Sequence, residues 1–204
     1  MTPGYSNNVF VNCPFDDGYR AKLNAIVYVI YRCGFVPHSA LEEDDASDNR
    51  LDKIVRCIEQ CKYGIHDISN IELNDEGFPR FNMPFELGIF FGAKRFGNNE
   101  QKSKNALVFE RTKFTYQKYI SDLNGIDTKA HKDDINVIIK HVRDWLKTAS
   151  KRKSIPWAST IQNDYQQFVT RLPQIAAIAT LDIDTMTFAD YCQVVEEAIA
   201  EILN

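Results

Sequence analysis

The sequence predicts an α/β protein with a doubly wound, mainly parallel sheet and a C-terminal helical extension. Short runs of β-branched and aromatic residues alternate with segments of helical apolar spacing as far as Glu110, a pattern typical of βαβ units. Beyond Glu110 the alternation fades and helical patterns dominate. The 204 residues suffice for one large domain or for one domain with an appendage. We expect an α/β domain over 1–128 and a helical extension over 129–204, which packs on that domain or serves oligomerisation.

The first half of the chain alternates strand patterns with helix patterns. A β-branched and aromatic run begins at Asn8 and stops at Cys13-Pro14, as a strand followed by a loop does. Gly34 is expected to end the first helix, and Ser47 or Asp48 to cap the second. The expected strands span residues 8–12, 35–41, 63–68 and 106–109. The expected helices span residues 19–33, 47–61 and 82–96, and polar loops are expected over 42–45 and 70–79.

The second half is expected to be helical. The pattern indicates a short helix over 115–123, a turn at Asn124-Gly125 and an amphipathic helix over 132–150. A basic connector over 150–154 precedes two further helical patterns. These span residues 160–179 and 188–203. The helices suit three roles, namely covering one sheet edge, forming a dimer interface or forming a small bundle.

The composition argues against several classes of protein. A formal net charge of -4 does not favour a nucleic-acid backbone as the main partner, so no direct nucleic-acid binding is expected. The apolar stretches fall short of the roughly 20 residues that span a bilayer, and the polar residues 1–8 lack a signal core, so we expect a soluble, cytoplasmic protein without membrane contact. Five irregularly spaced cysteines indicate reduced thiols, and no second pair of ligands completes a zinc site with Cys57 and Cys61, so no metal is expected. No Walker loop, dinucleotide glycine fingerprint, His-Glu-x-x-His motif or nucleophile elbow is present.

The expected topology predicts where a ligand binds. In an open parallel sheet the ligand lies outside the carboxyl ends of the strands, near the switch in strand order. This rule brings together the segments 12–15, 37–40 and 67–70 and the start of the helix at Asn82.

One helix carries the strongest candidate for chemistry. Asn82 is a suitable N-cap and Pro84 is tolerated in the first turn, so Glu86 is expected about one turn into the helix, near the ligand edge. Gly88 and Gly92 are four residues apart, and we expect them to pack tightly against the strands, because exposed helical glycines cost roughly 1 kcal/mol each. The aromatic residues expected to surround the carboxylate are Phe85, Phe90 and Phe91.

A family resemblance rests on two segments, His66-Asp-Ile-Ser69 and Asn82-Met-Pro-Phe-Glu-Leu-Gly-Ile-Phe-Phe-Gly-Ala93. Together they resemble the nucleoside 2-deoxyribosyltransferase-like and TIR-like nucleotide-binding superfamily, and the run from Val9 to Phe15 is similar to its first strand. The resemblance covers about residues 8–111. It implies a flavodoxin-like fold and cleavage of an N-glycosidic bond in a nucleoside, nucleotide or NAD. It implies no cofactor, with NAD entering only as a candidate substrate.

The resemblance also implies roles for individual residues. Glu86 matches the catalytic glutamate, which acts as a nucleophile in the transferases and helps to stabilise the ribosyl cation in TIR-type hydrolases. Asp67 matches the strand-end acid, which holds a sugar hydroxyl or assists proton transfer to the base. The chain departs from the family in its longer loop after Ser69, in Asn-Met-Pro for Asn-Pro-Asn, and in Arg95-Phe-Gly for Gly-Lys-Pro.

The candidate site therefore combines two catalytic carboxylates with a set of substrate-binding residues. The substrate-binding candidates are Asn12, Pro14, Phe15, Tyr19, His38, Ser69 and Asn82. Phe15 offers a stacking face, Tyr19 is the nearest counterpart of the transferases' aromatic residue, and His38 stands at an expected strand end.

Each assignment has a plainer alternative. Glu86 can also be interpreted as a first-turn glutamate that the helix dipole stabilises or that completes a capping box. Asp67 can be interpreted as a cap of the following loop. His66 lies inside a strand pattern and is interpreted as a core histidine. Arg50 and Arg80 suit either phosphate binding or the solvated surface.

We therefore expect an N-glycosidase or N-glycosyl transferase acting on a nucleotide through Glu86, with a homo-oligomeric assembly. The alternative is a nucleotide-sensing or signalling module that uses the same cleft without chemistry, as in bacterial stress or antiviral defence. A third alternative is a pure interaction protein that binds no nucleotide.

Overall fold

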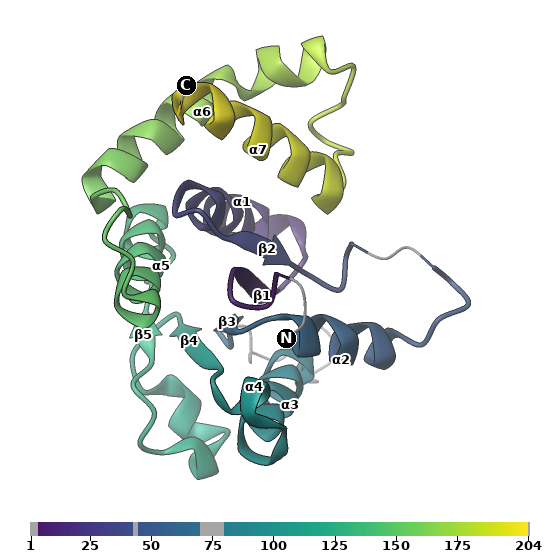
Figure 1. Ribbon diagram of the computed structural model, residues 1–204, viewed down its shortest axis with the longest axis vertical. Helices are drawn as coiled ribbons and strands as arrows, with labels where there is room; N and C mark the ends of the chain where they lie inside the picture. The colour runs from purple at the N-terminus through teal and green to yellow at the C-terminus, as the bar shows by residue number, and fades with distance from the viewer. Residues whose placement is uncertain (1–3, 43–44, 70–79, 204) are drawn as a thin grey trace.

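The computed structural model describes residues 4–42, 45–69 and 80–203, and its centre is a five-stranded parallel sheet of order β2-β1-β3-β4-β5 (Figure 1). The strands are β1 (Asn8–Asn12), β2 (Val36–His38), β3 (Tyr63–Asp67), β4 (Asn105–Glu110) and β5 (Lys129–Ala130). This order is that of flavodoxin-like folds, and the strand order reverses between β1 and β3. The expected doubly wound, flavodoxin-like α/β fold is confirmed.

One face of the sheet is covered by α1 (Asp17–Arg32) and α5 (Ile135–Ser150), and the opposite face by α2 (Arg50–Gln60), α3 (Asn82–Phe96) and the short α4 (Asn99–Lys102) (Figure 1). The helix α1 follows an N-cap at Asp16 and ends before Gly34, whose φ of 77° confirms the expected terminating glycine. The consecutive residues Ala25 to Ile30 of α1 are wholly buried. A helix that is apolar on all sides in this way is an interior helix.

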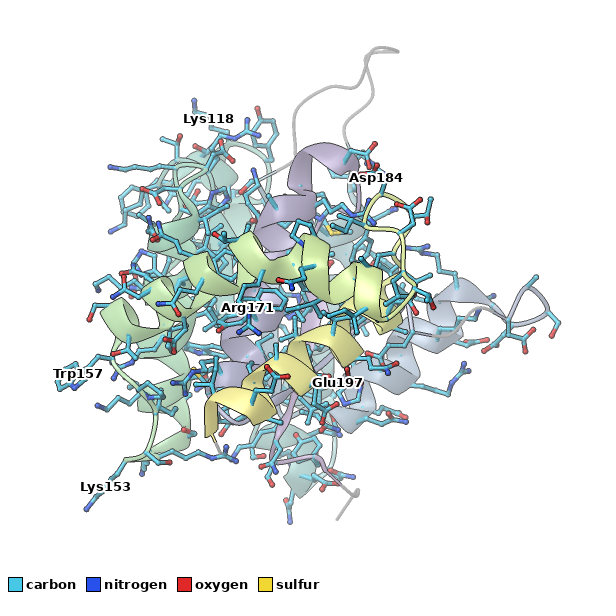
Figure 2. The ribbon with its side chains drawn as sticks, turned by 90° about the horizontal axis from the view of Figure 1, so that it is seen from above. Lys118, Lys153, Trp157, Arg171, Asp184 and Glu197 are labelled. Atoms are coloured by element: carbon cyan, nitrogen blue, oxygen red, sulfur yellow. The ribbon has the colours of Figure 1, made fainter. Side chains whose placement is uncertain are left out.

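The remaining helices, α6 (Ala158–Ile178) and α7 (Phe188–Leu203), form an outer layer over α1 (Figure 2). Tyr28 of α1 packs its ring against Tyr165 and Phe168 of α6, with centroids 5.2 and 5.1 Å apart. The Tyr191 hydroxyl of α7 donates a hydrogen bond to the carbonyl of Asn24, at 3.2 Å. One hydrophobic cluster runs from the sheet through α1 to α6 and α7. The helices after α5 therefore pack on α1, on the side away from the sheet.

Several expected boundaries are wrong, for local reasons. The second strand is shorter than expected, ending at His38, because the chain turns at Ser39. The cap of α2 is Asn49, whose side chain accepts from the amide of Leu51, rather than Ser47 or Asp48. The expected helix over 115–123 is two 3₁₀ turns, Thr115–Lys118 and Ser121–Leu123. The expected loop 70–79 and two residues of the loop 42–45 lie outside the described residues.

The segment that joins β4 to α5 contains a strand that the sequence did not predict. The strand β5 has two residues and pairs with β4 through Phe109↔Lys129 and Glu110↔Ala130. The expected division after residue 128 thus falls just before β5, and both β5 and α5 belong to the sheet and its helical layer.

Candidate functional site

The carboxyl edge of the sheet gathers most of the predicted site residues into two neighbouring groups. The first group surrounds the start of α3 and contains Glu86. The second surrounds Asp67 at the end of β3. Cys13 directly follows β1, and burial together with the negative charges of Asp67 and Glu86 raises the pKa of its thiol well above its ordinary value. The predicted convergence of segments at this edge therefore holds for β1, β3 and α3.

Glu86 is a buried carboxyl group without a hydrogen bond. Its exposed fraction is 4%, and within the described part of the chain neither a hydrogen bond nor an ion pair reaches it. Burial raises its pKa to about 7, although the charge of Arg50 acts in the opposite direction. Glu86 therefore lies near its titration point at neutral pH, and its ionised form is poorly compensated.

A cavity of about 250 Å³, called cavity A here, opens beside the first turn of α3. It is lined by Pro14, Phe15, Asp16, Leu41, Arg50, Arg80, Asn82 and Met83. Asn82 and Met83 stand four and three residues before Glu86, so the three residues share one side of the helix. Pro14, Phe15 and Asn82, which were predicted to bind substrate, thus line this cavity together with Arg50 and Arg80.

The start of α3 leaves its positive end free of acidic side chains. The N-cap is Phe81, which makes no capping bond, and the first turn contains no acidic residue. The expected capping role of Asn82 is therefore wrong, because Asn82 is already the first helical residue and lines cavity A. Pro84 lies in the first turn, as expected. The helix N-terminus and the two arginines outweigh the one carboxylate of the lining, that of Asp16, which lies 3.8 Å from Arg80, so cavity A favours an anionic group.

The capping-box alternative for Glu86 is contradicted by the same geometry, because Glu86 lies beyond the first turn and makes no bond to the cap. The expected apolar sleeve is only partly formed. Phe90 is buried, but Phe85 is 56% exposed.

Asp67 is the centre of a buried polar network. The hydroxyl of Tyr19, from α1, donates a hydrogen bond to Asp67 Oδ2. The backbone amide of Ser69 donates to Asp67 Oδ1 at 2.8 Å, and His131 Nε2 lies 3.1 Å from Asp67 Oδ2. Burial alone raises the pKa of Asp67, but the hydrogen bonds from His131, Ser69 and Tyr19 outweigh burial and hold the pKa below its usual value.

The proton positions on His131 follow from its neighbours. Its Nδ1 accepts the backbone N–H of Asp133 at 2.9 Å, so the proton of the neutral ring is on Nε2. Nε2 faces both Asp67 and the Ser69 hydroxyl, the latter at 2.7 Å. A ring that donates from Nε2 does not take a proton from Ser69, so this serine is not an activated nucleophile.

Asn12, at the end of β1, connects the two sheet-edge groups to the core. Its Nδ2 donates to His66 Nδ1 at 3.0 Å and to the carbonyl of Met83 at 2.9 Å. Its Oδ1 is buried and has no hydrogen-bond partner among the described residues. His66 lies between the rings of Phe10 and Phe90, and burial lowers its pKa to about 3, so it is a neutral core histidine, as interpreted from the sequence.

His38 stands apart from both groups. Its Nδ1 lies 3.1 Å from a carboxylate oxygen of Glu42, and it lines neither cavity A nor the Asp67 network. The two helical glycines also differ from expectation. Among the described residues, no neighbouring heavy atom lies within 4 Å of a Cβ built on Gly88 or Gly92, so neither glycine packs against a strand.

His131 is the site residue that sequence reasoning missed. It follows β5 directly, so the rule of strand carboxyl ends would have selected it, but a strand of two residues leaves no periodic pattern. Among the described residues, no group of three or more His, Cys, Asp or Glu side chains is arranged to hold a metal ion.

Comparisons of the chain with protein-family models, curated proteins and solved structures gave no match. No helix within residues 4–42, 45–69 and 80–203 is long and apolar enough to cross a membrane. The five cysteines form no disulfide.

Proposed function

We propose that this chain cleaves the base–sugar bond of a nucleotide bound in cavity A, with Glu86 as the reacting carboxylate. The observation that carries the proposal is a buried carboxyl group to which none of the described residues donates a hydrogen bond, one helical turn behind the residues that line the cavity. The sequence resemblance to N-glycosyl transferases and hydrolases supports the same residue.

The chemistry follows from electrostatics. When the N-glycosidic bond breaks, its electron pair leaves with the base and positive charge develops on the sugar. An ionised Glu86 is poorly compensated in its apolar surroundings, so it gains most from a cation that appears beside it. The carboxylate either stabilises this cation until water attacks or forms a covalent bond to the anomeric carbon.

The residues that line cavity A suit the phosphate groups and the base of a nucleotide. Arg50 and Arg80 supply charge for phosphate groups, and both are exposed at the rim. Phe15 supplies a flat face for the base. NAD, other ribonucleotides and deoxyribonucleotides are the substrate candidates, and no cofactor is needed.

Asp67 has a positioning role in this proposal. Its oxygens are occupied by Tyr19, His131 and the Ser69 amide, and its lowered pKa makes it a poor proton donor. The network holds the end of β3 and Ser69 against Tyr19 of α1 and His131 after β5, and thereby shapes the edge of the site. Ser69 and Tyr19 then act through Asp67 rather than on the substrate.

The test measures release of free base by chromatography from NAD and from a panel of ribo- and deoxyribonucleotides. Wild type and the matched surface variant Glu59→Gln should release base, whereas Glu86→Gln should not. A second added base separates transfer from hydrolysis, since a transferase makes a new nucleoside. Full turnover by Glu86→Gln would refute the proposal.

A nucleotide-sensing module without chemistry is the second candidate function, and one observation favours it. Glu86 is only 4% exposed and does not itself line cavity A. AMP binding measured by calorimetry that is weakened about tenfold by Arg50→Gln or Arg80→Gln, but not by Arg95→Gln, supports a nucleotide site. The same binding without base release from any substrate would select the sensor.

The proposal also retains two expectations from the sequence, a homo-oligomer and a cytoplasmic location. Free thiols at all five cysteines suit a reducing compartment.

A further inference from the structure

A second cavity lies beside the proposed catalytic site. It has a volume of about 320 Å³ and is called cavity B here. It lies between the N-terminal half of α1 and the segment that joins α6 to α7. Its lining residues are Phe15, Asp16, Asp17, Arg20, Leu23, Asn24, Leu41, Leu172, Ile183, Asp184, Met186, Thr187, Phe188 and Tyr191.

Two hydrogen bonds hold the far wall of cavity B in place. The guanidinium of Arg20 donates to the backbone carbonyls of Asp184 and Met186 at 2.8 and 2.7 Å. Figure 2 shows Asp184 on this joining segment, next to α1. The wall is therefore tied to the α/β body, and the cavity is a built feature of the interface between α1 and the outer helices.

The charge of the lining is unbalanced. The lining contains three aspartates at exposed positions of its rim, Asp16, Asp17 and Asp184, and one arginine, Arg20. Asp16 caps α1 and lies 3.8 Å from Arg80, whereas within the described residues no ion pair reaches Asp17 or Asp184. The cavity therefore has two carboxylates to offer to a cation.

The other walls are apolar. Apart from the charged groups and two small polar residues, the lining consists of aliphatic and aromatic side chains. Apolar walls with a few charged groups at one side are typical of small-molecule sites, and the volume lies at the lower end of their range of about 300–1,000 Å³. A small molecule with an apolar ring and one positive charge would contact both the apolar walls and the carboxylates of cavity B.

We propose that cavity B is a second ligand site, selective for a small organic cation with an apolar body, such as an aromatic amine. The site is distinct from cavity A, whose two arginines favour anions, and it needs no catalytic activity of the chain. Phe15, Asp16 and Leu41 line both cavities, so the two sites are adjacent. A cation in cavity B also competes with Arg80 for Asp16.

The test uses three ring compounds of the same shape and different charge, namely benzylammonium, benzyl alcohol and benzoate. Each is titrated into the full chain while ¹H–¹⁵N NMR spectra are recorded. We expect benzylammonium to bind most tightly and to shift the amide signals of Asp17, Arg20 and Thr187. Equal binding of benzyl alcohol, or no shift with any compound, would overturn the proposal.

Matched variants locate the site. Removing each free carboxylate with Asp17→Asn or Asp184→Asn should weaken benzylammonium binding roughly two- to fivefold, whereas Asp122→Asn, an exposed carboxylate elsewhere, should not. Ile183→Trp should fill the cavity and abolish binding, while Ile178→Trp, at an exposed position outside the lining, should leave binding intact. Unchanged binding by a folded Ile183→Trp protein would place the ligand elsewhere and refute the assignment.

Discussion

Tyr19 donates its phenolic hydrogen bond to the carboxylate of Asp67, and this contact links the first helix to the end of the central strand. Both side chains are buried, with exposed fractions of 4% and 0%. The contact fixes α1 against the carboxyl edge of β3, where the proposed site lies. The hydroxyl is therefore expected to contribute to stability more than a surface hydrogen bond does.

Replacement of Tyr19 by Phe should destabilise the fold by about 1.5–3 kcal/mol at neutral pH, because a hydrogen bond to a buried charged group is lost. Asp67 has a lowered pKa, so the stability that it contributes is present above its ordinary pKa of 3.8 and is lost as the pH falls through the folded-state pKa. The difference between wild type and Tyr19→Phe should therefore shrink below about pH 3.8. Urea unfolding at several pH values measures it, and a constant difference would contradict the role of Asp67.

Removal of the His131 ring should be more costly. His131→Ala leaves the buried Asp67 carboxylate with fewer donors and empties a wholly buried position, for which we expect a loss of about 2–4 kcal/mol. His141→Ala, on a half-buried helical position, is the control and should cost less. The denaturant midpoints of the two variants measure these losses. An equal loss of stability in both variants would show that the contact of His131 with Asp67 adds nothing to stability.

The stability contributed by Glu86 should depend on pH with a sign opposite to that of Asp67. Its folded-state pKa of about 7 lies above the ordinary value of 4.5, so the unfolded chain releases the proton first as the pH rises. The ionised group then destabilises the fold increasingly between these two values, by at most about 3 kcal/mol. Glu86→Gln should consequently become more stable than wild type from about pH 4.5 to about pH 7, with a constant difference above. Parallel stability curves for the two proteins would show that Glu86 has an ordinary pKa.

The glycines of α3 should be replaceable. Because nothing in the described part of the chain lies within 4 Å of a Cβ at Gly88 or Gly92, alanine at either position should stabilise the protein by about 0.5–1 kcal/mol. Gly64→Ala is the contrasting variant, since its Cβ would lie 2.7 Å from both His66 Nε2 and the ring of Phe90. In thermal unfolding, Gly88→Ala and Gly92→Ala should have a higher Tm than wild type, and Gly64→Ala a lower one. Destabilisation by Gly88→Ala would indicate a contact on that face of α3.

The sequence predicted the elements around the candidate site where local signals were strong. The strand pattern over 63–68 and the helix pattern over 82–96, with Pro84 in its first turn, are confirmed by β3 and α3. Tertiary packing decided the rest. The spacing of Gly88 and Gly92 predicts that both glycines lie on the same side of α3. It does not predict whether that side faces the sheet. His131 was missed because hydrogen bonds to β4, rather than its own sequence, make its neighbours a strand.

The position of α1 has a consequence for the order in which the protein can be completed. This helix is synthesised before α6 and α7, which pack over one side of it. Until the chain has been extended through residue 203, the nascent protein exposes an apolar helix surface around Tyr28. Exposed apolar surface of this kind promotes aggregation of incomplete chains. Productive folding of this protein is therefore expected to wait until α6 and α7 have been synthesised and can reach α1.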